Sequence, residues 1–202
     1  VLVLLGVSVT SLYTPVDDLV PVLNSRWLVV HVAAAILSGA LFTVGAVATT
    51  AHLVRRRGGV SDDDPFADLA HSVHLVAFPI WTFAVIAGAI WAENSWGRYW
   101  GWDPIENAGL MPWLALTAFI HSIMVQKRRG MFRMWNLALI IIAFAFAQFG
   151  MFINRGGPVP SVHSFGQSTL GWVFLVFMGL TLLASFGLFF LRYNSLKSAQ
   201  TL

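Results

Sequence analysis

The stretch that decides the fold is residues 134–153, Met134-Trp-Asn-Leu-Ala-Leu-Ile-Ile-Ile-Ala-Phe-Ala-Phe-Ala-Gln-Phe-Gly-Met-Phe-Ile153. It contains no charged side chain. About 20 apolar residues in a helix cross the ~30 Å hydrocarbon core of a bilayer. A lone strand in lipid would leave its backbone groups unpaired, so the segment has to be a helix. This run therefore predicts a transmembrane helix.

Further apolar runs of similar length lie on both sides of this segment and predict four more spanning helices. They cover residues 27–54, 73–92, 108–125 and 170–191. Residues 1–12 resemble the end of a sixth helix. Because the sequence opens on Val1 inside that apolar run, we expect it to be part of a longer chain. The predicted fold class is an all-α, polytopic transmembrane bundle of about six helices, with residues 1–202 forming a single domain.

The composition agrees with a membrane protein and excludes several kinds of site. Hydrophobic residues make up 57% of the chain and charged residues 10%, whereas soluble domains have about 25% charged residues. Since the chain has no cysteine, disulfides and thiolate ligands are excluded, and a bound metal would need histidine, methionine or carboxylate ligands. The pI of about 9.8 reflects basic loops, so we expect no nucleic-acid partner.

The lysines and arginines predict which loops are cytoplasmic. Nine of the twelve lie in one set of loops: Arg55, Arg56, Arg57, Lys127, Arg128, Arg129, Arg133, Arg192 and Lys197. The other set carries only Arg26, Arg98 and Arg155. Cytoplasmic loops of membrane proteins are enriched in Lys and Arg. The loops at 13–26, 93–107 and 154–169 are therefore predicted to face outward.

Residues 91–107 form an expected outward loop with an unusual density of tryptophan. An interfacial aromatic belt accounts for one or two tryptophans at a helix end, but not for Gly97 and Gly101 between them. Indoles offer broad rigid faces to a planar ligand, glycine permits close backbone approach, and Arg98 can pair with a carboxylate. These residues alone are compatible both with an interfacial aromatic belt and with a platform that binds a planar ligand. The tryptophans are Trp91, Trp96, Trp100 and Trp102.

The run Trp96–Asn107 resembles the tryptophan-rich (WWD) signature of the cytochrome c biogenesis haem-handling family. That family includes CcsA/ResC-type proteins and CcmF-type haem lyases. Pro21–Val32 and Phe78–Glu93 look like the CcsA type, whereas Asp103–Asn107 and Ser161–Trp172 look more like the CcmF type. The resemblance covers most of residues 18–175.

This resemblance implies a role in cytochrome c maturation at the outer face of the inner (cytoplasmic) membrane. The implied activity is the binding of haem b and its delivery to, or attachment on, apocytochrome c, through thioether bonds to a Cys-x-x-Cys-His motif. The implied partners are apocytochrome c, a further membrane subunit of the assembly machinery and the lipid bilayer. A chain without cysteine fits this role, because the thiols come from the substrate.

The resemblance also implies which residues form the site. His31 and His163 flank the Trp-rich loop in the chain and would be the two axial ligands of haem iron. His121, deep in the helix after the loop, would ligate a second haem or mark the haem entry route. Residues 91–107 would be the haem-binding loop. Its contributing residues would be Trp96, Arg98, Trp100, Trp102 and Asp103. Asp103 also precedes Pro104, an arrangement typical of a helix N-cap.

The residues alone allow other interpretations of the histidines. His31 can be a packing histidine bonded to a carbonyl, and His163 a solvated loop residue. His52 is interpreted as a side chain that reaches the interface beside Arg55. His71 and His74, expected at the start of a membrane helix and on one face of it, are interpreted as a solvated face, with a metal or haem role as the alternative.

Two other functions remain as alternatives. One is a b-type electron-transfer cytochrome, which needs paired histidines at matched depth on facing helices. Only His121 is expected to lie deep in the membrane, which counts against it. The other is a haem-free solute transporter, which discontinuous helices and a charged midplane site would favour.

The charge bias generates a prediction of topology. In a functional variant with Trp100→Cys, an impermeant thiol reagent should label the cysteine from outside the cell. A cysteine replacing Lys127 should be labelled only after the membrane is permeabilised. Labelling of Trp100→Cys from the cytoplasmic side alone would refute the outward placement of the Trp-rich loop.

Overall fold

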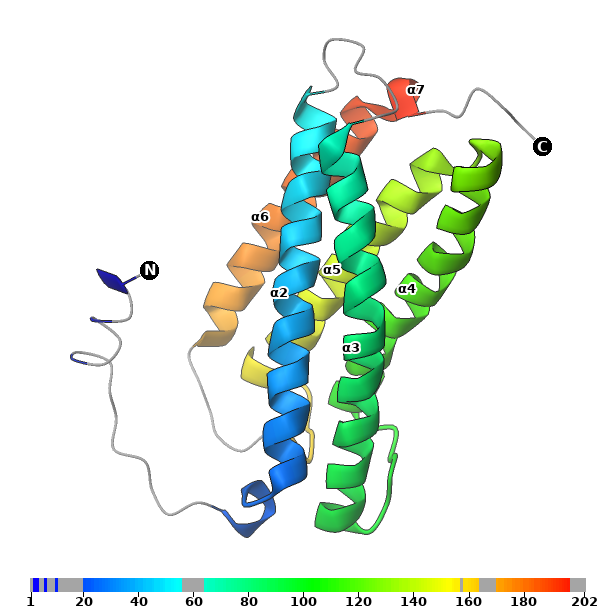
Figure 1. Ribbon diagram of the computed structural model, residues 1–202. Helices are drawn as coiled ribbons and strands as arrows, with labels where there is room; N and C mark the ends of the chain where they lie inside the picture. Colours follow the sequence, from blue (N-terminus) through cyan, green and yellow to red (C-terminus); the bar gives the residue numbers. More distant parts are fainter. Residues whose placement is uncertain are drawn as a thin grey trace.

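The computed structural model of the protein describes residues 20–55, 64–156, 158–163 and 170–196, together with Leu2, Val3, Gly6 and Thr10. The regular structure within these residues is helical throughout, which confirms the predicted all-α class (Figure 1). The elements are η1 (Pro21–Leu23), α2 (Arg26–Arg55), α3 (Pro65–Trp96), α4 (Pro104–Arg129), α5 (Arg133–Gly156), α6 (Leu170–Leu191) and α7 (Tyr193–Leu196). Helices α2 to α6 are long and apolar enough to span a membrane, as predicted. The helix end expected at residues 1–12 lies mostly outside the described residues.

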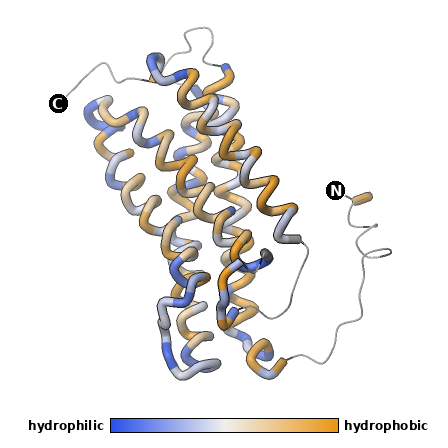
Figure 2. Tube along the Cα trace, turned by 180° about the vertical axis from the view of Figure 1, so that it is seen from behind, coloured by the Kyte–Doolittle hydropathy of each residue, from blue (hydrophilic) through white to orange (hydrophobic). Residues whose placement is uncertain are grey.

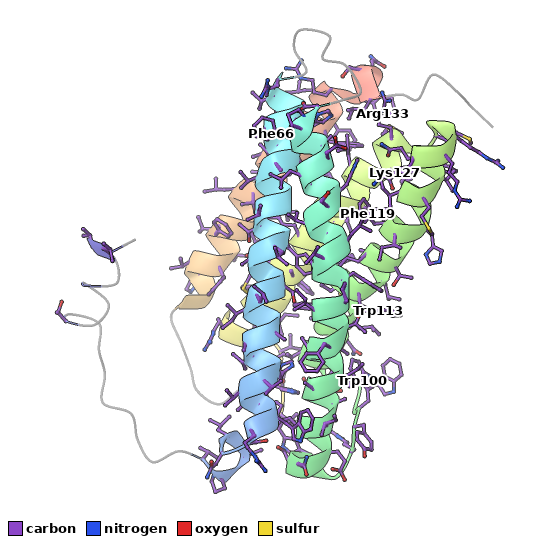
Figure 3. All side chains as sticks on the ribbon, in the orientation of Figure 1. Phe66, Trp100, Trp113, Phe119, Lys127 and Arg133 are labelled. Carbon is purple, nitrogen blue, oxygen red and sulfur yellow. The ribbon has the colours of Figure 1, made fainter. Side chains whose placement is uncertain are left out.

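The helices form an up-and-down bundle whose connections gather at two ends (Figure 1). Helix η1, the α3–α4 connection and segment 158–163 lie at one end, and the α4–α5 turn and α7 lie at the other. Figure 2 shows hydrophobic residues along the helices and hydrophilic residues near both ends. Trp100 lies at one end, and the basic residues Lys127 and Arg133 lie at the other (Figure 3). The predicted grouping of the loops is therefore confirmed in the described part of the chain.

Local sequence sets where α3 and α4 begin and end. Asp64 and Asp103 are the N-caps, and each is followed by a proline in the first turn. Gly97 and Gly130, with φ of 71° and 68°, end the two helices in the left-handed conformation, which glycine adopts without steric cost. Because α3 begins before residue 73 and continues to Trp96, the irregular part of the Trp-rich loop is only residues 97–103.

Helices α2 and α3 make the most extensive helix–helix contact and approach each other at two glycines. The ring of His31 on α2 lies over Gly88 of α3, and the ring of His74 on α3 lies over Gly45 of α2. Each glycine follows the histidine of its own helix by 14 residues, so an antiparallel pairing brings both histidines over glycines. Close packing at small residues is a common way to join helices in lipid.

The interior of the bundle corrects the interpretation of His71 and His74. His74 is fully buried and His71 is 6% exposed. The ring of His74 stacks on Phe42 of α2, and both histidine rings contact Phe119 of α4. The predicted solvated face is wrong because α3 begins at Pro65, which places both residues well inside the helix.

His52 is also placed differently from the prediction. It is 5% exposed, and its Nδ1 donates a hydrogen bond to Asp64 Oδ2 at 2.8 Å, so it does not reach towards the interface. Burial alone would raise the pKa of Asp64, but hydrogen bonds from the Phe66 N–H and His52, and the charge of Arg55, keep that pKa below its ordinary value. His52 thus joins the end of α2 to the start of α3.

The glycine contacts predict an asymmetric response to added methyl groups. Gly45→Ala should lower stability by about 1–3 kcal/mol, because the new Cβ overlaps the buried His74 ring. Gly39→Ala on the same helix is the matched control, since a Cβ there meets no atom within 4 Å. That control should be neutral, or stabilising by about 0.5–1 kcal/mol. Thermal unfolding in detergent measures both, and equal effects would contradict the close packing.

Candidate functional site

A cleft opens at the end of the bundle that carries the Trp-rich loop. Helix α2 contributes His31, α3 contributes Gly88 and Trp91, the loop contributes Trp100, and segment 158–163 contributes His163. The fold therefore brings the two predicted iron ligands to one cleft from distant parts of the chain.

His31 enters the cleft from the first turns of α2 in a defined orientation. Its Nδ1 lies 2.7 Å from the carbonyl oxygen of Ala84 on α3, which is an acceptor only, so Nδ1 carries the proton. The ring stacks near Trp91 with centroids 6.4 Å apart and planes inclined by 18°. Only Nε2 is then left for a ligand. A Cβ at Gly88 would lie 2.7 Å from His31 Nδ1, so the glycine makes room for this ring.

His163 is held at the other side of the cleft by a carboxylate. Its Nδ1 lies 3.1 Å from Asp103 Oδ1, which again leaves Nε2 as the available nitrogen. The ring meets Trp91 and Trp96 edge to face, with centroid distances of 5.5 and 4.9 Å. The interpretation of His163 as a solvated loop residue is therefore wrong, because its side chain is only 14% exposed.

Trp91 is the aromatic residue that contacts both histidines. It is 2% exposed, and its Nε1 donates a hydrogen bond to the Val22 carbonyl at 2.9 Å. It forms part of the tryptophan cluster but was not among the predicted site residues. Gly88 was also missed. The sequence contained a signal for Gly88, because a glycine inside a predicted helix costs about 1 kcal/mol of stability and so indicates a packing or functional reason.

Asp103 connects the Trp-rich loop to segment 158–163. It caps α4 as predicted, by accepting a hydrogen bond from the Ile105 N–H at 3.0 Å. Its carboxylate also accepts from Ser161 Oγ at 2.7 Å and from the Val162 N–H at 3.1 Å. Burial alone would raise the pKa of Asp103, but these hydrogen bonds and the nearby His163 keep that pKa below its ordinary value. The carboxylate form is therefore favoured at neutral pH.

The rest of the loop is shaped by Glu106, which completes the capping box of α4. Glu106 Oε2 accepts from the Gly101 N–H at 2.8 Å and the Asp103 N–H at 3.1 Å. Trp102 has a φ of 58°, which is uncommon for a residue other than glycine. Its carbonyl accepts from Asn107 Nδ2 at 3.0 Å. These bonds hold the loop in the conformation that places Trp100 against the cleft.

Five predicted site residues are not part of the cleft lining. Trp96 and Asp103 contact His163, and the other three are exposed. Trp102 is 73% exposed, and Arg98 is an exposed residue whose guanidinium lies over Gly101. His121 lies on the exposed side of α4, and its Nδ1 bonds the Thr117 carbonyl at 2.7 Å. The argument against an electron-transfer cytochrome assumed that His121 is the only histidine deep in the membrane. That assumption is wrong, since His74 is buried inside the bundle.

Residues 1–157 match the family model described as "Cytochrome C assembly protein". The chain belongs to the cytochrome c assembly protein family. Among curated relatives, Haemophilus influenzae "Cytochrome c-type biogenesis protein NrfE" is 38% identical over 185 residues, which are 88% of this chain and 28% of NrfE. Pseudomonas aeruginosa "Cytochrome c-type biogenesis protein CcmF" is 37% identical over 190 residues, or 92% of this chain and 28% of CcmF.

A solved structure extends the similarity to the fold. The chain matches "Cytochrome c Heme Lyase CcmF" with a TM-score of 0.67 and 28% identity, over 91% of this chain and 28% of that one. These relatives support the CcmF type, which Asp103–Asn107 and Ser161–Trp172 had indicated. The chain spans less than a third of the length of the relatives it matches.

Proposed function

We propose that the cleft binds haem b and that the protein holds it for attachment to apocytochrome c, at the outer face of the inner membrane. The observation that carries this proposal is the pair formed by His31 and His163. Both line one cleft, and each has Nδ1 engaged by an oxygen atom of the protein. Histidines that ligate metals commonly donate their second N–H to a carbonyl or carboxylate in this way.

The donor set of the cleft fits haem better than a free metal ion. Within the described residues, no group of three or more His, Cys, Asp or Glu is arranged to hold a metal. Two imidazoles fit an iron whose other four ligands come from a macrocycle. The indole of Trp100 lines the same cleft and offers a flat apolar surface to that macrocycle, while Trp91 packs against both histidine rings.

The chain's own residues would bind, orient and shield this substrate. His31 and His163 would hold the iron through Nε2, while Trp91 would keep the two rings apart and exclude water from the buried side. The substrate supplies the vinyl groups, and each cysteine S–H of the apocytochrome adds across one vinyl C=C to form a thioether. These 202 residues contain no cysteine, so none of their side chains competes for the vinyl groups.

We further propose that His121 serves a second haem or its entry route, with a partner ligand from another helix or subunit. Its exposed position on α4, within an apolar helix, supports this assignment. Arg98 and Trp102 remain predicted haem contacts from the Trp-rich loop, although neither lines the cleft. The names of the relatives, which are cytochrome c biogenesis proteins, agree with this role.

Removing either proposed axial ligand should abolish cytochrome c maturation. His31→Ala and His163→Ala should each lower the haem content of the purified protein and change its absorbance spectrum, because one iron bond is lost. His52→Ala is the control, since it removes a buried histidine at the opposite end of α2. It should reduce thermal stability but leave the haem content of each folded molecule unchanged. Normal maturation in both ligand variants would refute the assignment.

Trp100 and Trp102 of the Trp-rich loop should differ in how much they contribute to haem affinity. Trp100→Ala removes a surface that lines the cleft, so haem binding should weaken by roughly one to two orders of magnitude, as expected for a stacking contact of about 1–3 kcal/mol. Trp100→Phe should be milder, because it keeps a flat face. Trp102→Ala should weaken binding less than Trp100→Ala. Haem titrations measure all three, and full affinity in Trp100→Ala with reduced protein abundance would indicate a membrane anchor instead.

A further inference from the structure

The same arrangement of aspartate, proline and histidine occurs twice in the protein, once at each end of the bundle. Asp64 precedes Pro65 and caps α3 through the Phe66 N–H at 3.0 Å. Asp103 precedes Pro104 and caps α4 through the Ile105 N–H at the same distance. Each carboxylate also accepts a hydrogen bond from a histidine Nδ1, at 2.8 Å from His52 and at 3.1 Å from His163. Both carboxylates are buried.

The two pairs differ in what carries the histidine. His52 lies on α2, only 12 residues before its aspartate, and the helix itself fixes its position. His163 lies 60 residues after Asp103 in a non-helical segment. In the described part of the chain, the three hydrogen bonds that join segment 158–163 to another element all end on Asp103, and they come from Ser161 Oγ, Val162 N–H and His163 Nδ1. The hydrogen bonds that position His163 therefore depend on one carboxylate, while its ring also packs against Trp91 and Trp96.

We propose that Asp103 is the positioning residue for His163: it docks segment 158–163 on the start of α4 and keeps the imidazole with Nδ1 as donor and Nε2 towards the ligand. This inference rests on the proposed haem site. A carboxylate that accepts the second N–H makes a ligating imidazole more basic, whereas the Ala84 carbonyl opposite His31 carries no charge. The two axial ligands are therefore unequal, with the stronger electron donor on the segment that Asp103 attaches.

The first experiment measures haem affinity and reduction potential in the full protein, purified in detergent. Asp103→Ala should weaken haem binding by roughly 10- to 100-fold, the usual cost of removing a residue that orients a metal ligand. Asp103→Asn keeps a helix cap and an acceptor oxygen, so most of the affinity should remain. Its haem should have a higher midpoint potential, because the neutral amide makes His163 a weaker donor.

The matched control is Asp64→Asn, which changes the same type of aspartate–histidine pair at the opposite end of the bundle. It should lower thermal stability, because a charged hydrogen-bond partner of His52 is lost. The affinity for haem and the midpoint potential should equal those of the unmodified protein. A potential that moves equally in Asp64→Asn and Asp103→Asn would overturn the proposal, because the effect would then be one of general stability.

A second experiment needs no haem. Amide hydrogen exchange of residues 158–163 should be faster in Asp103→Ala than in the unmodified protein, since the Val162 N–H loses its acceptor. If Asp103→Ala fails to fold, Asp103→Asn carries the potential measurement, and Ser161→Ala, which removes one docking bond, carries the exchange measurement. Unchanged exchange in the folded variants would overturn the docking role.

The outcomes separate this inference from the proposed function. If the unmodified protein binds no haem, the proposed function fails and the positioning of a ligand fails with it. If the unmodified protein binds haem and Asp103→Asn and Asp103→Ala match it in affinity and potential, only the role of Asp103 is overturned. Weaker binding in Asp103→Ala together with a raised potential in Asp103→Asn supports both.

Discussion

The structure depends on one constraint, which is that backbone N–H and C=O groups in hydrocarbon must be paired inside the segment that carries them. Long helices satisfy this condition, and the irregular segments among the described residues lie at the ends of the bundle. The N-terminal amides of each helix then need partners of their own. Asp64 and Asp103 supply them at the starts of α3 and α4, and Gly97 and Gly130 allow those helices to stop within one residue. The functional loop is therefore short, and its two ends are held by rigid helices.

Close packing of α2 against α3 then decides where the first histidine lies. Two rings lie over two glycines of the opposite helix, so the two helices approach closely at both levels. At the loop end this contact places His31 beside Trp91, and at the deeper level it places His74 among Phe42 and Phe119. The same helix pairing thus places one histidine in the cleft and another in the buried core.

The second histidine reaches the cleft by a different route. His163 lies outside the helices and is held by hydrogen bonds that end on Asp103 and by ring contacts with Trp91 and Trp96. The carboxylate is already required as the cap of α4, so one side chain links the helix start, the Trp-rich loop and the segment carrying His163. One side of the cleft is therefore built on a helix, and the other is formed by a segment that docks through hydrogen bonds.

The sequence by itself determined the spanning helices, the grouping of loops, the cap at Asp103 and the Trp-rich loop. These features follow from local properties: the length of an apolar run, the placement of charge, and the residue types at a helix start. The sequence did not determine which side chains on those helices are buried. In a segment that is apolar on all sides, a histidine such as His52, His71 or His74 gives no periodicity to show whether it faces a neighbour or the surroundings. The contacts of Trp91 with both histidine rings, the fit of His31 over Gly88, and the bond from His163 to Asp103 join residues far apart in the chain. Only the tertiary structure decides such contacts, because they depend on which helix faces pack together and on where the connecting segments dock.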